Sequence, residues 1–385
     1  MSSQKRTFLY QVNVTRDCNL RCTHCYISTD KKVASQYMED QQFIRVFDTL
    51  IDFLQSPSGK SQYSVVEIHV IGGEPTMLGY DFFARILPQV KDRLSQVEQE
   101  VRLTLVSNLV TKDAVEIAKL FDAVATSYEF NTRFVSLKGR PLKALEEQWI
   151  SNVNLLRDAG YEVTVTMAVT KQATQIGAHE VLSFFFDKGF RQIHLGFFIP
   201  SGDGLINMLD VFPLFEETSK FMIDACDWYL ARREKYKDLY INPVESMIDS
   251  IYYDKPLDDI ICPIIPGSID VDWDGETVTC IEAGGEVDMD SLGNIYEQDL
   301  SQILSSVKYI KERATAIMPK PHCVGCDEFR SCQSACGILH QYWNGQGECP
   351  GFKGFIKHVR GVTDQGVKPK HMLFTDSDSE LFRGC

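Results

Sequence analysis

Apolar residues follow two alternating periods over residues 7–200. Short β-branched runs such as VVEIHVI (65–71) and VRLTLVS (101–107) are typical of buried strands. Between such runs, apolar residues recur at helical spacing, and Gly160 provides a helix C-cap. The pattern predicts strands over 8–14, 65–71, 101–107, 123–130, 161–170 and 191–199, and helices over 38–54, 80–94, 112–121, 142–160 and 177–189.

Six strands that alternate with helices predict an α/β fold, a parallel sheet with helices outside it. A doubly wound sheet and an incomplete barrel both fit this pattern. In either fold, ligands bind at the carboxyl ends of the strands. Residues 17–26 follow the first strand, residues 72–76 the second and residues 107–108 the third. We therefore expect these segments to meet at one mouth of the sheet.

The pattern changes after residue 205. A helix is predicted over 214–236, and alternation around Asp274-Gly275 in residues 268–282 indicates a β-hairpin. Residues 323–349 are rich in cysteine and have little periodicity, so their fold would depend on bound metal. We divide the chain into a core at 1–205, a helical linker at 206–261, a cysteine-rich domain at 262–363 and a polar tail at 364–385.

Composition and charge narrow the classes of function. The formal net charge of −14 disfavours nucleic acid and anionic membranes as partners, because phosphate binding needs clustered Lys and Arg. The N-terminus lacks the apolar core of a signal peptide, and no apolar run reaches the roughly 18 residues of a membrane span. We therefore expect a cytoplasmic protein, in which the 12 cysteines serve metal binding or catalysis rather than disulfides.

Cys18, Cys22 and Cys25 follow the first predicted strand with the spacing C-x3-C-x2-C. A disulfide needs two thiols and a closed zinc site needs four ligands, whereas three thiolates on a four-iron cube leave one iron open to a small molecule. A zinc site with His24 as its fourth ligand is the alternative. Together with the GGEP motif at residues 72–75, the three-cysteine motif resembles the radical S-adenosylmethionine (SAM) family.

This resemblance implies a partial (β/α)6 TIM-type barrel with a [4Fe–4S] cluster on the three cysteines. The open iron would chelate SAM, and one electron would cleave SAM to a 5′-deoxyadenosyl radical that takes a hydrogen atom from the substrate. Gly72, Gly73, Glu74 and Pro75 would bind the methionine amino group of SAM, since two glycines let backbone carbonyls approach an ammonium closely.

Further SAM contacts are implied at other strand ends. His24 would lie near the adenine, or it is an ordinary packed histidine. Ser107, Asn108 and Ser127 would contact the carboxylate or ribose of SAM, or they only form turns. Glu129 resembles an acidic position that follows a serine in related enzymes.

A second cysteine set lies toward the C-terminus. Taken singly, its C-x2-C spacing would suit zinc ribbons. Taken together, its seven spacings resemble the SPASM domain of radical SAM enzymes that modify peptides and proteins. By this resemblance, Cys262, Cys280 and Cys336 would hold auxiliary cluster I, and Cys323, Cys326, Cys332 and Cys349 would hold auxiliary cluster II, so that three [4Fe–4S] clusters accompany SAM.

Three cysteine ligands would leave auxiliary cluster I with an open iron, or with a non-cysteine ligand such as Asp or a backbone group. Cys226 is 36 residues upstream of Cys262 and is interpreted as a buried helical thiol. Cys385 receives no role.

The resemblance favours a maturase that forms a cross-link or an oxidised residue in a ribosomal peptide. One alternative is a sulfatase-type Ser/Cys oxidase that forms formylglycine, although the Asp expected directly after Cys280 is replaced by Ile281-Glu282. Another is a small-molecule radical SAM dehydrogenase or epimerase, a group that usually has fewer auxiliary cysteines. A non-enzymatic, zinc-stapled binding module is disfavoured by the GGEP and three-cysteine motifs.

The same reading predicts the partners of the enzyme. A peptide would be the substrate, and a flavodoxin- or ferredoxin-like protein would donate electrons. Only 17 residues precede Cys18, so a separate leader-binding protein is expected unless the core binds the peptide directly.

Overall fold

A curved sheet organises the computed structural model, which describes residues 6–31, 36–135, 141–257, 262–284 and 290–370. Its strands are β1 (Thr7–Asn13), β2 (Val65–Ile71), β3 (Glu100–Ser107), β4 (Ala123–Ser127), β5 (Val163–Val169), β6 (Gln192–Phe197), β7 (Tyr240–Asn242), β8 (Ser268–Val271), β9 (Glu276–Val278) and β10 (Gly293–Asn294). Within the described residues the strand order is β10-β9-β8-β1-β2-β3-β4-β5-β6-β7. β1 to β6 are parallel, and each pairs with the next along the chain. This order is that of a barrel wall, because a doubly wound sheet reverses its strand order partway.

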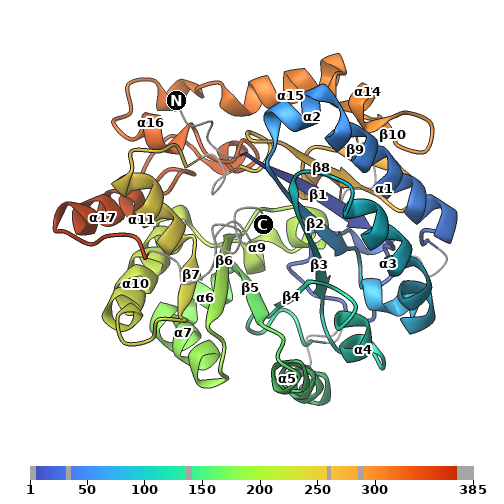
Figure 1. The fold of residues 1–385 in the computed structure, drawn as a ribbon. Coiled ribbons are helices and arrows are strands. Elements are labelled where there is room, and N and C mark those ends of the chain that lie inside the picture. The colour runs from blue at the N-terminus through green and yellow to red at the C-terminus, as the bar shows by residue number, and fades with distance from the viewer. Residues whose placement is uncertain (1–5, 32–35, 136–140, 258–261, 285–289, 371–385) are drawn as a thin grey trace.

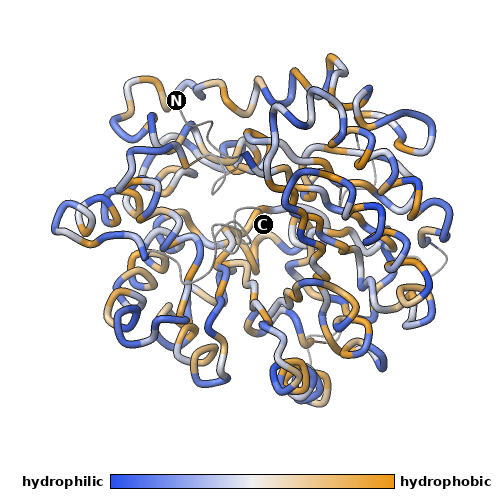
Figure 2. Tube along the Cα trace, viewed as in Figure 1, coloured by the Kyte–Doolittle hydropathy of each residue, from blue (hydrophilic) through white to orange (hydrophobic). Residues whose placement is uncertain are grey.

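Helices surround the arc of strands on its outer side (Figure 1). Val66, Ile68 and Val70 of β2 belong to the same buried cluster as Phe43 of the first helix and Phe83 of the third. Hydrophobic and hydrophilic positions occur together along these helices, as expected for one buried and one exposed face (Figure 2). The helices of this half are α1 (Asp40–Gln55), α2 (Pro57–Gln62), α3 (Tyr80–Leu94), α4 (Ala114–Ala118), α5 (Lys143–Asp158), α6 (Lys171–Ile176), α7 (Ala178–Asp187), α8 (Gly202–Ile206) and α9 (Met208–Val211).

The inner face of the barrel wall is polar. Glu67 and His69 of β2, Thr104 of β3 and His194 of β6 are buried although their side chains are polar. Successive strand residues point to opposite faces, so these residues alternate with the apolar ones that meet the helices. The barrel therefore encloses a polar lumen.

Several short helices were not predicted from the apolar pattern, α2 and α6 among them. The N-terminus of α2 is capped by Ser56, whose Oγ accepts a hydrogen bond from Gly59 N at 3.1 Å. Thr170 caps α6 in the same way through Ala173 N, at 3.5 Å. Such helices depend on a cap rather than on an apolar stripe. β4 also ends at Ser127, earlier than the predicted strand over 123–130.

The chain after residue 205 extends both edges of the barrel sheet. β7 pairs in parallel with β6, inside the region expected to be a helical linker. β8 pairs in parallel with β1 and forms the predicted hairpin with β9, with Gly275 at φ +88°. The remaining helices are α10 (Phe215–Arg233), α11 (Val244–Tyr252), α13 (Ile281–Gly284), α14 (Leu300–Leu304), α15 (Val307–Ile317), α16 (Phe329–Cys332) and α17 (Lys353–Asp364).

The first residues of the predicted tail lie against α10 and α11. Arg233 donates a hydrogen bond to Lys368 O at 2.7 Å, and Lys370 N donates to Glu245 Oε1 at 2.5 Å. The rest of that tail, 371–385 with Cys385, is outside the described residues. In the described part of the chain, no helix is both long and apolar enough to cross a lipid bilayer.

Candidate active site

The loop after β1 presents Cys18, Cys22 and Cys25 at the carboxyl end of the sheet. Cys25 N donates to Cys22 O at 3.3 Å, and Leu20 N donates to Cys18 Sγ at 3.4 Å. Burial raises the pKa of the Cys22 thiol to about 12, and the charges of the Cys25 and Cys18 thiolates add to this effect, whereas Arg133 opposes it. Thiolates this close together need positive charge beside them, which a bound metal centre supplies.

Two glycines bring the loop after β2 against the cysteine loop. Gly73 N donates to Thr15 O at 2.8 Å. A Cβ on Gly73 would lie 2.5 Å from Arg16 O and closer still to Asp17 O. Gly72 has a φ of +150°, which residues with side chains rarely adopt. The glycines therefore allow the two loops to approach, and their predicted contact with SAM stays a prediction.

Glu74 connects the ends of β2 and β3. Its Oε1 accepts a hydrogen bond from Ser107 Oγ, and its Oε2 accepts one from Asn108 N, both at 2.7 Å. Burial raises the pKa of Glu74, and hydrogen bonds from Thr76, Asn108 and Ser107 oppose that rise. Asn108 Nδ2 also donates to Asn19 Oδ1 at 2.7 Å, beside Cys18. The structure therefore brings the predicted residues Glu74, Ser107 and Asn108 together, and hydrogen bonds connect Glu74 to the other two.

His24 belongs to a buried charge network. His24 Nε2 and Arg133 Nε lie 2.9 and 2.8 Å from the same oxygen, Glu129 Oε2. Burial alone would raise the pKa of Glu129, but His24 and Arg133 lower it to about 2. His24 Nδ1 is buried without a hydrogen-bond partner among the described residues, so it is available to a bound molecule. Sequence reasoning missed Arg133, for which the i,i+4 spacing from Glu129 was the available signal.

The other predicted SAM contacts lie on neighbouring strand ends. Ser127 ends β4, and its Oγ accepts a hydrogen bond from Thr166 Oγ1 at 3.1 Å. Pro75 is buried at the start of a short 3-10 helix, Pro75–Leu78. Both residues are at the mouth, as expected, but their roles stay predictions.

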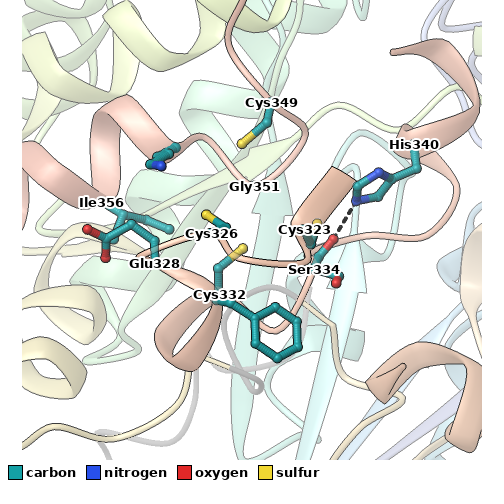
Figure 3. A pocket seen from close by; sticks show the side chains of 11 residues that line it. Cys323, Cys326, Glu328, Cys332, Ser334, His340, Cys349, Gly351 and Ile356 are labelled. Carbon is teal, nitrogen blue, oxygen red and sulfur yellow. Dashed lines mark hydrogen bonds between the residues drawn. The ribbon is translucent and has the colours of Figure 1, made fainter. Parts of the chain in front are cut away.

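Four C-terminal cysteines line one cavity (Figure 3). A Cβ on Gly351 would lie 2.5 Å from Cys332 Sγ and 3.8 Å from Cys349 Sγ, so glycine is needed where the chain passes these sulfurs. Burial raises the pKa of Cys332, and the charges of the other three cysteines raise it further. The structure thus gathers the set predicted for auxiliary cluster II, namely Cys323, Cys326, Cys332 and Cys349.

Cys336 lies near Cys262 and Cys280, the other two cysteines predicted for auxiliary cluster I. In the sequence it stands between Cys332 and Cys349, which are predicted for auxiliary cluster II. Burial raises the pKa of Cys336 to about 11, and the charge of Cys262 contributes. Burial, then the charges of Glu282, Cys336 and Cys262, raise the pKa of Cys280. Glu282 therefore lies near Cys280 and Cys336, and its Oε2 accepts a hydrogen bond from Ser201 Oγ at 2.5 Å.

A single zinc ion requires its sulfur ligands to lie close together. Tetrahedral zinc with Zn–S bonds of about 2.3 Å holds its sulfurs roughly 3.8 Å apart. Among the described residues, only Cys226, Asp227 and His358 place three such ligand atoms within 4.8 Å of one another. None of the predicted cysteine sets in the described part of the chain is that tight, and their assignment to iron–sulfur clusters stays a prediction.

Arg16 ties the cysteine loop to the C-terminal hairpin. Its Nε donates to Asp272 Oδ1 at 2.7 Å and its Nη2 to Gly284 O at 3.0 Å, while Asp270 lies 3.9 Å away. Burial disfavours the charge on Arg16, but Asp272 and Asp270 hold its pKa above the usual range. Sequence reasoning missed this link. The alternating acidic residues of the predicted hairpin were its available signal.

Comparison with known families agrees with this arrangement. The Radical SAM superfamily matches residues 12–184, and the SPASM iron–sulfur cluster-binding domain matches residues 262–333. The chain belongs to the radical SAM superfamily and carries a SPASM domain. The expected enzyme class and the α/β barrel with a C-terminal SPASM domain are thereby confirmed. This radical SAM enzyme belongs to families whose cofactors are iron–sulfur clusters and SAM.

Solved structures share the fold. The structure of anSMEcpe with bound AdoMet and a Kp18Cys peptide has a TM-score of 0.72 at 14% identity, over 93% of this chain and 99% of that one. Streptococcus suis SuiB bound to its precursor peptide SuiA has a TM-score of 0.56 at 14% identity, over 89% of this chain and 74% of that one. At these identities the likeness concerns the fold. No curated protein sequence matches the chain.

Proposed function

We propose that this radical SAM enzyme is a peptide maturase that forms a cross-link or an oxidised residue in a ribosomally made peptide. The observation that supports the proposal is the shared fold over 93% of this chain and 99% of anSMEcpe, in a structure that holds a peptide. SuiB, which has the same fold, also holds a peptide. A separate leader-binding protein and a flavodoxin- or ferredoxin-like donor belong to this proposal.

In this proposal, different residues of the chain would hold the iron–sulfur clusters and bind SAM. Cys18, Cys22 and Cys25 would hold one [4Fe–4S] cluster, and the seven C-terminal cysteines would hold two more. When bound, these groups and SAM supply a 5′-deoxyadenosyl radical that removes a hydrogen atom from the peptide. His24, with its unpartnered Nδ1, and the loop at Gly72-Gly73 would bind and orient SAM.

Iron and zinc per chain after anaerobic reconstitution test the cofactor part of the proposal. We expect about 12 irons and no zinc, as three four-iron clusters require. Changing Cys18, Cys22 and Cys25 together to Ala should remove about 4 irons and abolish SAM cleavage. Cys226→Ala is the matched control and should keep all of the iron. About 4 irons plus zinc would make the C-terminal cysteines a zinc unit and remove the main support for a maturase.

Candidate precursor peptides encoded beside this protein then test the reaction. With SAM and a reductant, we expect a peptide product that has lost two hydrogens and whose fragmentation is blocked across the linked residues. A product only from small molecules would favour the dehydrogenase or epimerase alternative.

The position of Glu282 supports a second candidate function, a Ser/Cys oxidase. Its carboxylate lies beside Cys280 and Cys336, one residue beyond the position expected for the Asp of that group. With a Ser- or Cys-containing peptide, an aldehyde product that disappears in Glu282→Gln while SAM cleavage persists would favour the oxidase. A cross-linked product that survives this substitution would favour the maturase.

A further inference from the structure

The lumen of the barrel contains a cavity of about 320 Å³. Residues of β2 to β6 that face inward line it, among them His69, Thr104, Thr166 and His194. His69 pairs with Thr104 in the register of β2 and β3, so the two side chains are neighbours on the same face.

The cavity opens at the end of the barrel opposite the cysteine loops. Its lining includes Asp122, Gly160 and Glu162, which are exposed and directly precede β4 and β5. It extends inward to Val106, close to the carboxyl end of β3, and to Thr166 in the middle of β5. A molecule entering there would therefore reach the region beneath the mouth without passing the cysteines.

In the deep part of the cavity wall, two buried polar atoms have no hydrogen-bond partner within the described residues. These are His69 Nδ1 and Thr104 Oγ1, and both residues are only 4% exposed. Buried polar atoms in folded proteins are nearly always satisfied by protein, water or ligand. The two atoms thus indicate where a bound group would be held.

His69, in the deep part of the cavity, is uncharged at neutral pH. Burial, and then the charge of His194, lowers the pKa of His69 to about 4, so its ring is uncharged at neutral pH. The charged residues of the lining, Arg102, Asp122 and Glu162, are at the amino ends of their strands, near the opening. An ion moved from water to His69 and Thr104 would lose its hydration, and neither of these two side chains offers it an opposite charge.

We propose that this cavity binds a small neutral group that both donates and accepts hydrogen bonds, a carboxamide or a hydroxyl, held by His69 and Thr104. A threonine hydroxyl donates and accepts, and each nitrogen of a neutral imidazole does one of the two. The volume is at the lower end of ligand sites, roughly 300–1,000 Å³, and suits a small molecule or one side chain. The proposal holds whether or not the enzyme is a peptide maturase.

Ligand-observed NMR titration of the reconstituted holoenzyme tests the proposal. The probes are acetamide, acetate and methylammonium, and we expect saturable binding of acetamide alone. Thr104→Val keeps the shape of the side chain and should weaken acetamide binding about tenfold or more. Thr218→Val is the matched control, because Thr218 is a buried threonine of α10 outside the lumen.

Two capped amino acids distinguish the source of the group. Binding of N-acetyl-glutamine N-methylamide, but not of its alanine counterpart, would point to a side chain of a peptide. Binding of acetamide but of neither capped residue would point to a free small molecule. Absence of saturable binding by acetamide and by both capped residues, equal binding of acetate, or unchanged acetamide affinity in Thr104→Val would overturn the proposal.

A measurement on the unmodified protein covers the case in which Thr104→Val does not fold. Diethyl pyrocarbonate acylates neutral imidazoles, and saturating acetamide should slow acylation of His69 while leaving the exposed His179 unchanged. Equal rates at His69 with and without acetamide would contradict the site.

Discussion

Single side chains at the barrel mouth are held by charge partners from other strands and loops. Glu129 follows β4, and its carboxylate joins His24 of the cysteine loop to Arg133. Glu129 is buried, and the side chains of His24 and Arg133 are only 8 and 13% exposed. The charges of Glu129 and Arg133 therefore depend on each other for compensation. In the lumen below the mouth, by contrast, burial and the charge of His194 lower the pKa of His69, so this side chain is uncharged at neutral pH.

Glu129→Gln should lower the free energy of unfolding by roughly 3 kcal/mol, because Arg133 would be left buried without a carboxylate. Anaerobic denaturant titration measures the change. Glu116→Gln is the control, since Glu116 pairs with Lys119 on an exposed helix face and should change stability by less than about 0.5 kcal/mol. Equal effects of the two substitutions would contradict the importance of the buried network.

His69 should make the protein less stable as the pH falls. Its pKa is about 4 when folded and 6.5 in the reference state, so between these values the unfolded chain binds a proton that the folded chain does not. From pH 6.5 to about 5.5, the wild type should lose about 1 kcal/mol more than His69→Asn. Denaturant titrations at the two pH values measure this difference. His179→Asn, at an exposed site, should leave the pH dependence as in the wild type.

The loops after β1 and β2 act as one structural element at the mouth. The glycines at 72 and 73 put the second loop against the backbone of the first, where no side chain would fit. Glu74 then connects this loop to the end of β3. The position of the cysteines therefore depends on contacts between three strand ends.

Gly73→Ala should disturb this element, because its Cβ would collide with the carbonyl oxygens of Arg16 and Asp17. We expect a loss of roughly 1–3 kcal/mol in stability, together with weaker retention of iron by the first cysteine set. Denaturant titration and iron analysis measure these effects. In Gly361→Ala, on α17, the new Cβ would meet open space, so this control should be neutral or stabilising. Full iron content and unchanged stability in Gly73→Ala would refute the role given to this glycine.

The radical SAM barrel and the SPASM region share one sheet. β8 pairs with β1, the strand that leads into the cysteine loop. Arg16 then connects this loop to Asp272 and Gly284. We therefore expect the barrel and the SPASM region to respond together when this connection is removed.

Arg16→Met should cost roughly 3–5 kcal/mol, because Asp272 would stay buried without its partner. Adding Asp272→Leu should cost less than the sum of the two single effects. The matched control is Arg45→Met, since Arg45 of α1 pairs with Asp299 near α14 in an exposed ion pair and should change stability by about 1 kcal/mol or less. Additive effects of the Arg16 and Asp272 substitutions would show that the two residues do not interact.

The sequence alone predicted individual strands, helices and motifs wherever the pattern of buried residues or ligands lies within one continuous segment. The strand over 65–71 and the helix over 80–94 have the predicted bounds, since apolar periodicity directly reflects which face is buried. The three N-terminal cysteines were recognisable for a similar reason, because ligands within one loop leave a fixed spacing.

Only the tertiary structure decided how these segments combine. The order of the sheet, the short strand β7 and the joining of β8 to β1 depend on pairing between distant segments, which no local period encodes. Arg16 and Asp272 are 256 residues apart, and neither would be expected to be buried alone. The polar lumen also depends on tertiary structure. Each strand contributes one or two ordinary polar residues, and only the curvature of the sheet places them around a common cavity.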